Sequence, residues 1–183
     1  MKAKLNNLGF NLGQLILSRR LKKTGRDRRV INLDEAESIV IIYDVVNEKR
    51  FAEVRTLQQQ LNTNKRKVMV IGYIDSKTIP NYCVEANAGY FFNRRSVNWF
   101  GLPKADYLNQ FVMKSFDILV DLTTEGHFIT KYLTGLSISK FKSGKYSEAK
   151  KLYLDLMIEC DPDASFADFI RQTLHYLKII KSK

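Results

Sequence analysis

Several polar side chains able to bind a ligand or move a proton stand at the ends of predicted β-strands. Asp44 and Asp75 follow apolar runs directly, and Asp121 and Asp161 lie close to the ends of two others. In an open parallel sheet, ligands bind beyond the carboxyl ends of the strands, so these carboxylates would face one crevice. The predicted crevice comprises Asp44, Asp75, Asp121, Thr123, Thr124 and His127. The alternative is structural, because aspartate is also common in turns and at helix starts.

His127 is the residue of this group best suited to acid–base chemistry. It is predicted near the start of a helix, where the helix dipole lowers the pKa of an imidazole and favours its neutral form. A neutral imidazole acts as a general base or as a hydrogen-bond donor. The alternative is an exposed first-turn residue without a chemical role. His175 falls on the polar face of the last predicted helix, so the two histidines form no metal-site spacing and we predict no metal.

A second group mixes cations with aromatic rings between residues 93 and 103. Arg94 and Arg95 precede Trp99 and Phe100 in the sequence. Aromatic rings stack on bases or sugars and guanidinium groups hold phosphates, which makes these four residues a candidate binding patch. In the alternative interpretation, the two rings fasten a loop to the core while the arginines stay in water.

The signatures of the common nucleotide-binding mechanisms are missing from the sequence. Val45-Val46-Asn47 follows the first strong strand, where a glycine-rich GxGxxG turn would be needed, and no GxxxxGK[ST] segment occurs. No arrangement typical of a catalytic triad is present either. We therefore predict no cofactor and favour a role without catalysis, with an enzymatic role as the alternative.

Two strand–helix–strand units would position these side chains. The first runs from the apolar strand Ser38–Tyr43 through a helix to the strand Lys67–Ile74. The second spans Ser115–Gly144, with a buried strand, a helix over residues 127–136 and a strand over residues 137–142. Two parallel strands joined by a helix require a right-handed crossover. The predicted fold is a single three-layer, Rossmann-like α/β domain with a mostly parallel sheet of about five strands.

Polar residues before the apolar runs predict where helices begin. Asn47 is expected to cap the helix of the first unit, and Thr123 or Thr124 the helix of the second. Ser165 is expected to cap the final helix, because an acid follows it three residues later in the capping-box pattern. Between these helices, residues 152–158 are predicted to form the last strand.

The N-terminal residues form a separate unit in the predicted organisation, a basic amphipathic helical arm over residues 1–29 followed by the α/β domain over residues 30–183. Residues 1–30 hold nine cations against one acid, so they carry +8 of the net charge of +11. Leucine and isoleucine recur at helical spacing, which predicts one apolar stripe. The stripe consists of Leu5, Leu8, Leu12, Leu15, Ile16 and Leu21. Gly9 and Gly13 weaken this helix, each costing about 1 kcal/mol relative to alanine.

The arm offers the most direct means of binding a partner. Its apolar stripe is expected to pack on the protein's own sheet or on a second copy of the chain. A cationic cluster beside such a stripe also suits an anionic membrane surface, where each cation adds ~1 kcal/mol. Nonspecific nucleic-acid binding is the third alternative, because charge alone supplies such affinity. The cationic cluster comprises Arg19, Arg20, Lys22, Lys23, Arg26, Arg28 and Arg29.

Bulk properties of the chain favour a cytoplasmic location. No stretch approaches the ~18 consecutive apolar residues of a membrane span, so no transmembrane segment is expected. Cys83 and Cys160 lie in no CxxC or Cys/His cluster, which favours reduced thiols in a reducing compartment. Peripheral attachment to the inner face of the membrane is compatible with the cationic arm.

Three segments carry a resemblance to a known family: IVIIYD at residues 39–44, NWFGLP at residues 98–103, and FDILVDLT followed by LSISKFKSG within residues 116–144. They resemble a small family of Bacteroidetes proteins without an assigned activity. Residues 116–144 also resemble a segment of the acceptor-side domain of heptosyltransferase-like glycosyltransferases, which implies a sugar or nucleotide ligand. Those enzymes need a second domain for the donor, so we expect the half-fold without the full reaction.

The sequence therefore predicts an interaction domain that binds a protein or a membrane surface through its basic arm. One alternative is a glycosyltransferase-like enzyme, or a binder of a sugar or nucleotide, with its site at the carboxyl ends of the strands. The other alternative is a nonspecific nucleic-acid binder.

Overall fold

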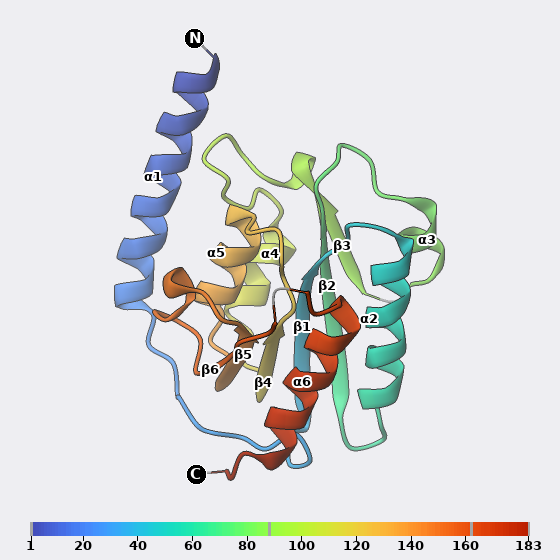
Figure 1. Ribbon diagram of the computed structural model, residues 1–183. Coiled ribbons are helices and arrows are strands. Elements are labelled where there is room, and N and C mark those ends of the chain that lie inside the picture. Colours follow the sequence, from blue (N-terminus) through green and yellow to red (C-terminus); the bar gives the residue numbers. More distant parts are fainter. Residues whose placement is uncertain (1, 88, 162, 183) are drawn as a thin grey trace.

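Six parallel strands form one open sheet in the computed structural model, which describes residues 2–87, 89–161 and 163–182, with the backbone alone for residues 2–8 and 10. The strands follow the spatial order β3-β2-β1-β4-β5-β6 (Figure 1). Their bounds are β1 (Ser38–Asp44), β2 (Lys67–Ile74), β3 (Tyr90–Asn93), β4 (Ile118–Asp121), β5 (Phe141–Lys145) and β6 (Leu156–Ile158). Every neighbouring pair runs parallel. The predicted Rossmann-like fold is confirmed, with one strand more than expected.

Helices cover both faces of this sheet and complete the predicted three layers (Figure 1). One face packs against α1, α4 and α5, and the other packs against α2, α3 and α6. The bounds are α1 (Lys2–Lys23), α2 (Glu48–Leu61), α3 (Asn81–Glu85), α4 (Asp106–Val112), α5 (Phe128–Leu136) and α6 (Phe166–Ile179). Two short 3-10 turns, η1 (Arg94–Ser96) and η2 (Glu148–Lys150), follow β3 and β5.

The central strand β1 is buried on both faces. Ile39 and Ile41 contribute to the core beneath α2 and α6, whereas Val40 and Ile42 contribute to the core beneath α4 and α5. Successive side chains of a strand point to opposite faces, so a strand covered on both sides needs an unbroken apolar run. The uninterrupted run of aliphatic residues in β1 is explained by this double burial.

Two of the three predicted helix caps are confirmed. The Asn47 side chain accepts a hydrogen bond from the Arg50 N–H at 2.9 Å, and Ser165 forms a reciprocal capping box with Asp168. The predicted cap of α5 is wrong, because His127 occupies the N-cap position and makes no side-chain capping bond. Thr123 and Thr124 lie earlier in the chain than this N-cap. Thr123 donates hydrogen bonds to Asp121, and the Thr124 N–H donates one to Asp44.

The last two strands begin later than the apolar pattern predicts. β5 begins at Phe141 and β6 at Leu156, so residues 137–140 and 152–155 are not strand. The buried hydroxyls of Ser137 and Ser139 lie 2.8 Å apart and bond to each other. This local bond satisfies the two buried hydroxyl groups in a segment that does not pair with a strand.

Helix α1 docks on its own domain, along α5 and the loop at residues 98–103. Leu17 is buried in the core beneath α4 and α5, and Leu21 packs against the same core. Leu12 and Leu15 lie outside this contact and remain 40% and 46% exposed, so only part of the predicted apolar stripe packs on the domain. The side chains of Leu5 and Leu8 lie outside the described residues. The inner face of α1 is therefore narrower than the leucine pattern indicates.

Two glycines of α1 allow this close approach. A Cβ atom added at Gly9 would lie 2.9 Å from the carbonyl oxygen of Trp99, and one added at Gly13 would collide with the carbonyl oxygen of Phe100. Glycine lowers helix propensity, but here the missing side chain lets the helix touch the loop backbone. The glycines are thus packing residues of α1 rather than weak points alone.

Arginines after and within α1 fasten it further. Arg20 donates a hydrogen bond to the Tyr132 hydroxyl on α5. The nearly buried Arg26 side chain pairs with Asp155 at 2.7 Å and donates to the Ser139 carbonyl at 3.0 Å. Two of the seven cations of the basic cluster therefore bind the domain itself.

Replacing Gly13 with alanine tests how strongly the fold depends on the α1 contact. Alanine has the higher helix propensity by about 1 kcal/mol, so an undocked helix would gain stability. Because the added methyl group would collide with the loop backbone, we expect a loss of about 1–3 kcal/mol in the free energy of unfolding. Urea unfolding followed by circular dichroism measures this difference.

The matched control is Asn11→Ala, at an exposed position two residues earlier in the same helix. We expect this variant to be neutral or slightly stabilised. A gain of similar size in both variants would contradict the docked position of α1.

Candidate functional site

Asp44 and Asp121, two of the predicted site residues, lie where the strand order reverses. Strands β1 and β4 are neighbours, although their helical connections leave in opposite directions, and Ile42 pairs with Asp121 across them. Such a switch point is where ligands bind in open α/β sheets. Asp44 ends β1 and Asp121 ends β4, so both carboxylates occupy this position.

Asp44 is the most unusual of the predicted site residues. Its side chain is 2% exposed, and Oδ2 accepts hydrogen bonds from the backbone N–H groups of Thr124 at 2.8 Å and Glu125 at 3.0 Å. Its other oxygen, Oδ1, is buried without a hydrogen-bond partner among the residues that the structure describes. Burial raises the pKa of Asp44, while the two backbone bonds and nearby His127 oppose that rise. One oxygen thus holds the loop after β4, and the other is left to accept a bond.

Asp121 differs from Asp44 because both of its oxygens are occupied. Oδ1 accepts hydrogen bonds from the Thr123 N–H at 3.0 Å and hydroxyl at 2.6 Å, and Oδ2 pairs with the Lys150 amine at 2.9 Å. The same amine donates to the Thr123 hydroxyl at 3.1 Å. A buried carboxylate that is paired and hydrogen-bonded in this way is a structural group.

His127 and Asp75 belong to a cluster on the β2 side of this switch point. Arg94 donates two hydrogen bonds to Asp75, at 2.6 and 2.8 Å, and the Tyr73 hydroxyl donates a third at 3.1 Å. The Arg94 hydrogen bonds hold the pKa of Asp75 below its usual range. The half-buried His127 ring meets the Tyr73 ring edge-on at 4.9 Å between centroids. Arg94, predicted as part of the aromatic patch, therefore pairs with Asp75 of the predicted crevice.

The remaining predicted residues make other contacts. Trp99 and Phe100 stack on each other at 4.8 Å between ring centroids, in the loop that contacts α1. The Thr124 hydroxyl receives a hydrogen bond from Arg50 at 2.7 Å. Asp161 is exposed and accepts a bond from the Asp163 N–H at 3.0 Å, which makes it a turn former. Arg95 is exposed and follows Arg94 in η1.

Two important polar residues escaped prediction. Lys150 pairs with Asp121 across 29 positions of sequence, and no local pattern signals that contact. Lys142 is buried in β5 and donates hydrogen bonds to the carbonyls of Thr134 at 2.8 Å and Gly135 at 2.9 Å. Burial lowers the pKa of Lys142 to about 7. Its amine satisfies carbonyl groups at the end of α5, which is a common role for lysine.

The arrangement supports hydrogen bonding more readily than metal binding. Across the described ranges, no group of three or more histidine, cysteine, aspartate and glutamate side chains is placed to hold a metal ion. The unpaired Asp44 oxygen can accept a hydroxyl or amine hydrogen, and a raised pKa lets the protonated acid donate instead. The half-buried His127 adds a second proton-transferring group nearby.

The contrast between the two buried aspartates gives a testable difference. Because the folded-state pKa of Asp44 is raised above its ordinary value of 3.8, stability is lost as pH rises through that raised value. We expect Asp44→Asn to raise the free energy of unfolding at pH 7 by about 1 kcal/mol. The reason is that a neutral amide at this buried position avoids the cost of burying an ionised carboxylate. Chemical unfolding at pH 7 and at pH 3.5 measures this gain, which should shrink at the lower pH.

Asp121→Asn is the control, because it breaks the buried ion pair with Lys150. We expect this variant to lose about 3 kcal/mol at pH 7. Comparable destabilisation of both variants would show that Asp44 is also held by a partner.

Comparison with known proteins supports one family assignment. No curated protein and no solved structure matches the chain. A family model matches residues 11–180, which include the second half of α1 together with all six strands. The expected membership of a family without an assigned activity is thereby confirmed, while the Bacteroidetes and glycosyltransferase resemblances stay predictions. The chain belongs to the family of unknown function DUF6913.

Proposed function

We propose that the protein is a peripheral binding domain that attaches to an anionic membrane surface through the outward face of α1. The observation that carries this proposal is a stripe on that face, which consists of Leu12, Leu15, Arg19, Lys22 and Lys23. Residues three and four apart share one side of a helix. Exposed leucines therefore continue directly into exposed cations, opposite the face that packs on α5.

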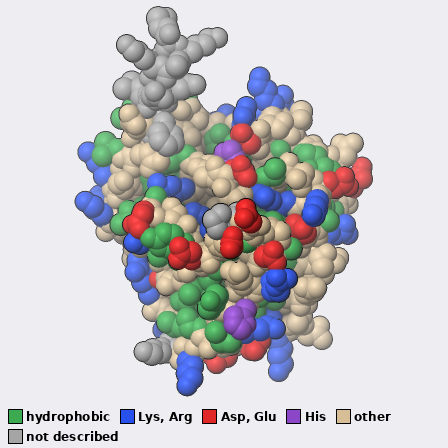
Figure 2. Space-filling model, viewed as in Figure 1, with side chains coloured by type: hydrophobic (Ala, Val, Ile, Leu, Met, Phe, Trp, Pro, Cys, Tyr) green, Lys and Arg blue, Asp and Glu red, His purple; other side chains and the backbone are tan. Residues whose placement is uncertain are grey.

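The chemistry of this stripe suits a lipid surface. Arg19, Lys22 and Lys23 are exposed and form no ion pair with any residue in the described part of the chain. Lysine and arginine side chains gather along the side of the molecule where the lower half of α1 lies (Figure 2). Apolar insertion and attraction to anionic headgroups together give stable attachment where either alone is weak. No helix in the described ranges is long and apolar enough to cross a bilayer.

Charge reversal on the outward face tests the proposal. Lys22→Glu/Lys23→Glu replaces two cations with acids, and each cation near anionic lipid adds ~1 kcal/mol, so binding should weaken by more than tenfold. Co-sedimentation with vesicles of phosphatidylglycerol and phosphatidylcholine measures the partition coefficient. Vesicles of phosphatidylcholine alone should bind the unmodified protein poorly.

Lys65→Glu/Lys178→Glu has the same net charge and serves as the control, because both lysines are exposed away from α1. Equal losses of vesicle binding in the two double variants would show that only the overall charge matters. That result would contradict binding through the outward face of α1. If Leu12→Ser/Leu15→Ser altered the oligomeric state and left vesicle binding unchanged, the leucines would instead serve contact with a second copy.

A second candidate function is the binding of a sugar or nucleotide at the carboxyl ends of β1 and β4. The unpaired, buried Oδ1 of Asp44 favours it, because a desolvated carboxylate gains most from a ligand hydroxyl. The resemblance of residues 116–144 to glycosyltransferases favours the same ligand class. Entry to Asp44 requires the exposed loop residues Thr124–Gly126 to move aside, since the aspartate itself lies beneath them.

A thermal-shift panel of nucleotide sugars, sugar phosphates and nucleotides tests this second function. A ligand at a hundred times its dissociation constant stabilises the folded state by ~2.7 kcal/mol, which raises the melting temperature measurably. We expect Asp44→Asn to abolish the shift and Asp163→Asn, an exposed aspartate at the same end of the sheet, to preserve it. Silence across the panel would count against a ligand at this site.

A further inference from the structure

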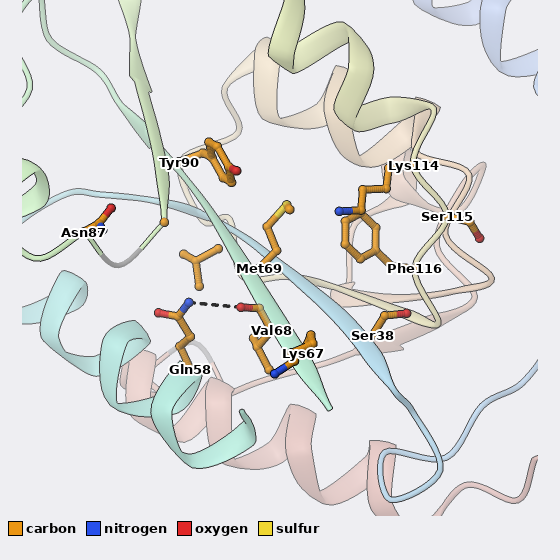
Figure 3. A pocket seen from close by; sticks show the side chains of 12 residues that line it. Ser38, Gln58, Lys67, Val68, Met69, Asn87, Tyr90, Lys114, Ser115 and Phe116 are labelled. Atoms are coloured by element: carbon orange, nitrogen blue, oxygen red, sulfur yellow. Dashed lines mark hydrogen bonds between the residues drawn. The ribbon is translucent and has the colours of Figure 1, made fainter. Parts of the chain in front are cut away.

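A cleft lies at the end of the sheet opposite the switch point, beside the edge of β2. Strand β3 pairs only with Ile71–Ile74, so Lys67–Val70 has no neighbouring strand on that side among the described residues. The cleft beside this half of β2 encloses about 480 Å³ (Figure 3). That volume falls within the range of about 300–1,000 Å³ typical of small-molecule sites.

Aromatic and thioether groups form the centre of the cleft. The Met69 side chain rises between Tyr90 on one side and Lys114 with Phe116 on the other (Figure 3). A second hollow of about 180 Å³ shares Met69, Tyr90 and Lys114 and continues toward Phe111. The two hollows therefore lie side by side and share Met69, Tyr90 and Lys114 as wall residues.

Tyr90 is held as a platform. Its ring stacks on the Tyr107 ring, with 6.3 Å between centroids and an interplanar angle of 27°. The Tyr90 side chain nevertheless remains 54% exposed. A tyrosine fixed by one stacking partner and open to solvent offers a surface for a planar ring at low entropic cost. Met69 adds a polarisable sulfur that favours contact with aromatic edges.

The charge of the cleft has one sign. Lys67 and Lys114 line it, and no carboxylate is found among the described residues that line either hollow. The Lys114 amine lies 5.3 Å from the centroid of the Phe116 ring, which positions the cation at the wall. Uncompensated lysines beside an aromatic platform favour a ligand that is both planar and anionic.

The polar groups at the edge of β2 argue against an added peptide strand. The Val68 N–H donates to the Asn62 side-chain oxygen at 3.3 Å, and the Gln58 amide donates to the Val68 carbonyl at 3.2 Å. Helix α2 thus supplies side chains that already satisfy the backbone groups a strand would need. The space left beside them suits a small molecule better than an extended chain.

We propose that this cleft binds a planar aromatic anion, with its ring against Tyr90 and Met69 and its anionic group at Lys114 and Lys67. An aromatic carboxylate and a nucleoside monophosphate share this chemistry. The site lies away from both α1 and Asp44, so it stands or falls independently of the membrane and switch-point proposals.

Titration of the full chain with 4-hydroxybenzoate and with adenosine monophosphate, followed by calorimetry, separates the two ligand sources. The neutral counterpart of 4-hydroxybenzoate is 4-hydroxybenzamide, and that of adenosine monophosphate is adenosine. A probe that binds at least tenfold tighter than its neutral counterpart identifies the class of ligand that the cleft binds. Inorganic phosphate alone should bind weakly, since it lacks the ring. We expect Tyr90→Ala and Lys114→Met each to weaken binding of that probe by about tenfold.

Tyr176→Ala and Lys104→Met are the matched controls, because both side chains are exposed and line neither hollow. They should leave the affinity unchanged. The proposal is overturned if neither probe binds, if the cleft variants bind as well as the controls, or if a single-stranded oligonucleotide binds more than tenfold tighter than the mononucleotide with the same dependence on Tyr90.

Discussion

The burial of β1 between β2 and β4, with helices on both faces, is the constraint on which the rest of the structure depends. A strand in that position has no solvent-exposed side, which explains the unbroken aliphatic run over residues 39–42. Polar side chains are therefore found at the ends of such a strand. Asp44 lies at one of those ends and is buried like the rest of the strand, which raises its pKa. Its unusual chemistry is thus a consequence of topology.

The N-terminal helix is best understood as a third-layer element with two different faces. Its inner face is made of glycines, Leu17 and Leu21, which bring it against α5 and the loop at residues 98–103. Its outer face keeps leucines and cations in water. Arg20 and Arg26 make inner contacts with the domain, so the basic cluster combines anchoring arginines with exposed cations. Charge counts alone cannot separate these two uses.

Sequence patterns predicted the elements whose signals are local. The aliphatic run of β1, the Asn47 cap and the Ser165 capping box all depend on residues within a few positions of each other. The late starts of β5 and β6 escaped prediction, because pairing with a neighbouring strand decides where each begins. For the candidate site, the sequence correctly placed Asp44 and Asp121 at or near strand ends. It did not reveal that Lys150 pairs with Asp121 and not with Asp44, because those two residues are far apart in the sequence. The cleft beside β2 depends on the short length of β3, which no pattern within β2 reveals.

The contact between Arg20 and Tyr132 has a consequence for synthesis on the ribosome. These residues are 112 positions apart, so α1 leaves the ribosome before α5 and must wait for it before this contact can form. At a translation rate of about 5–20 residues per second, that interval lasts roughly ten seconds. During this time the residues of α1 that later contact α5 lack that partner. Helix α1 therefore reaches its native packing only after a much later segment of the chain has been made.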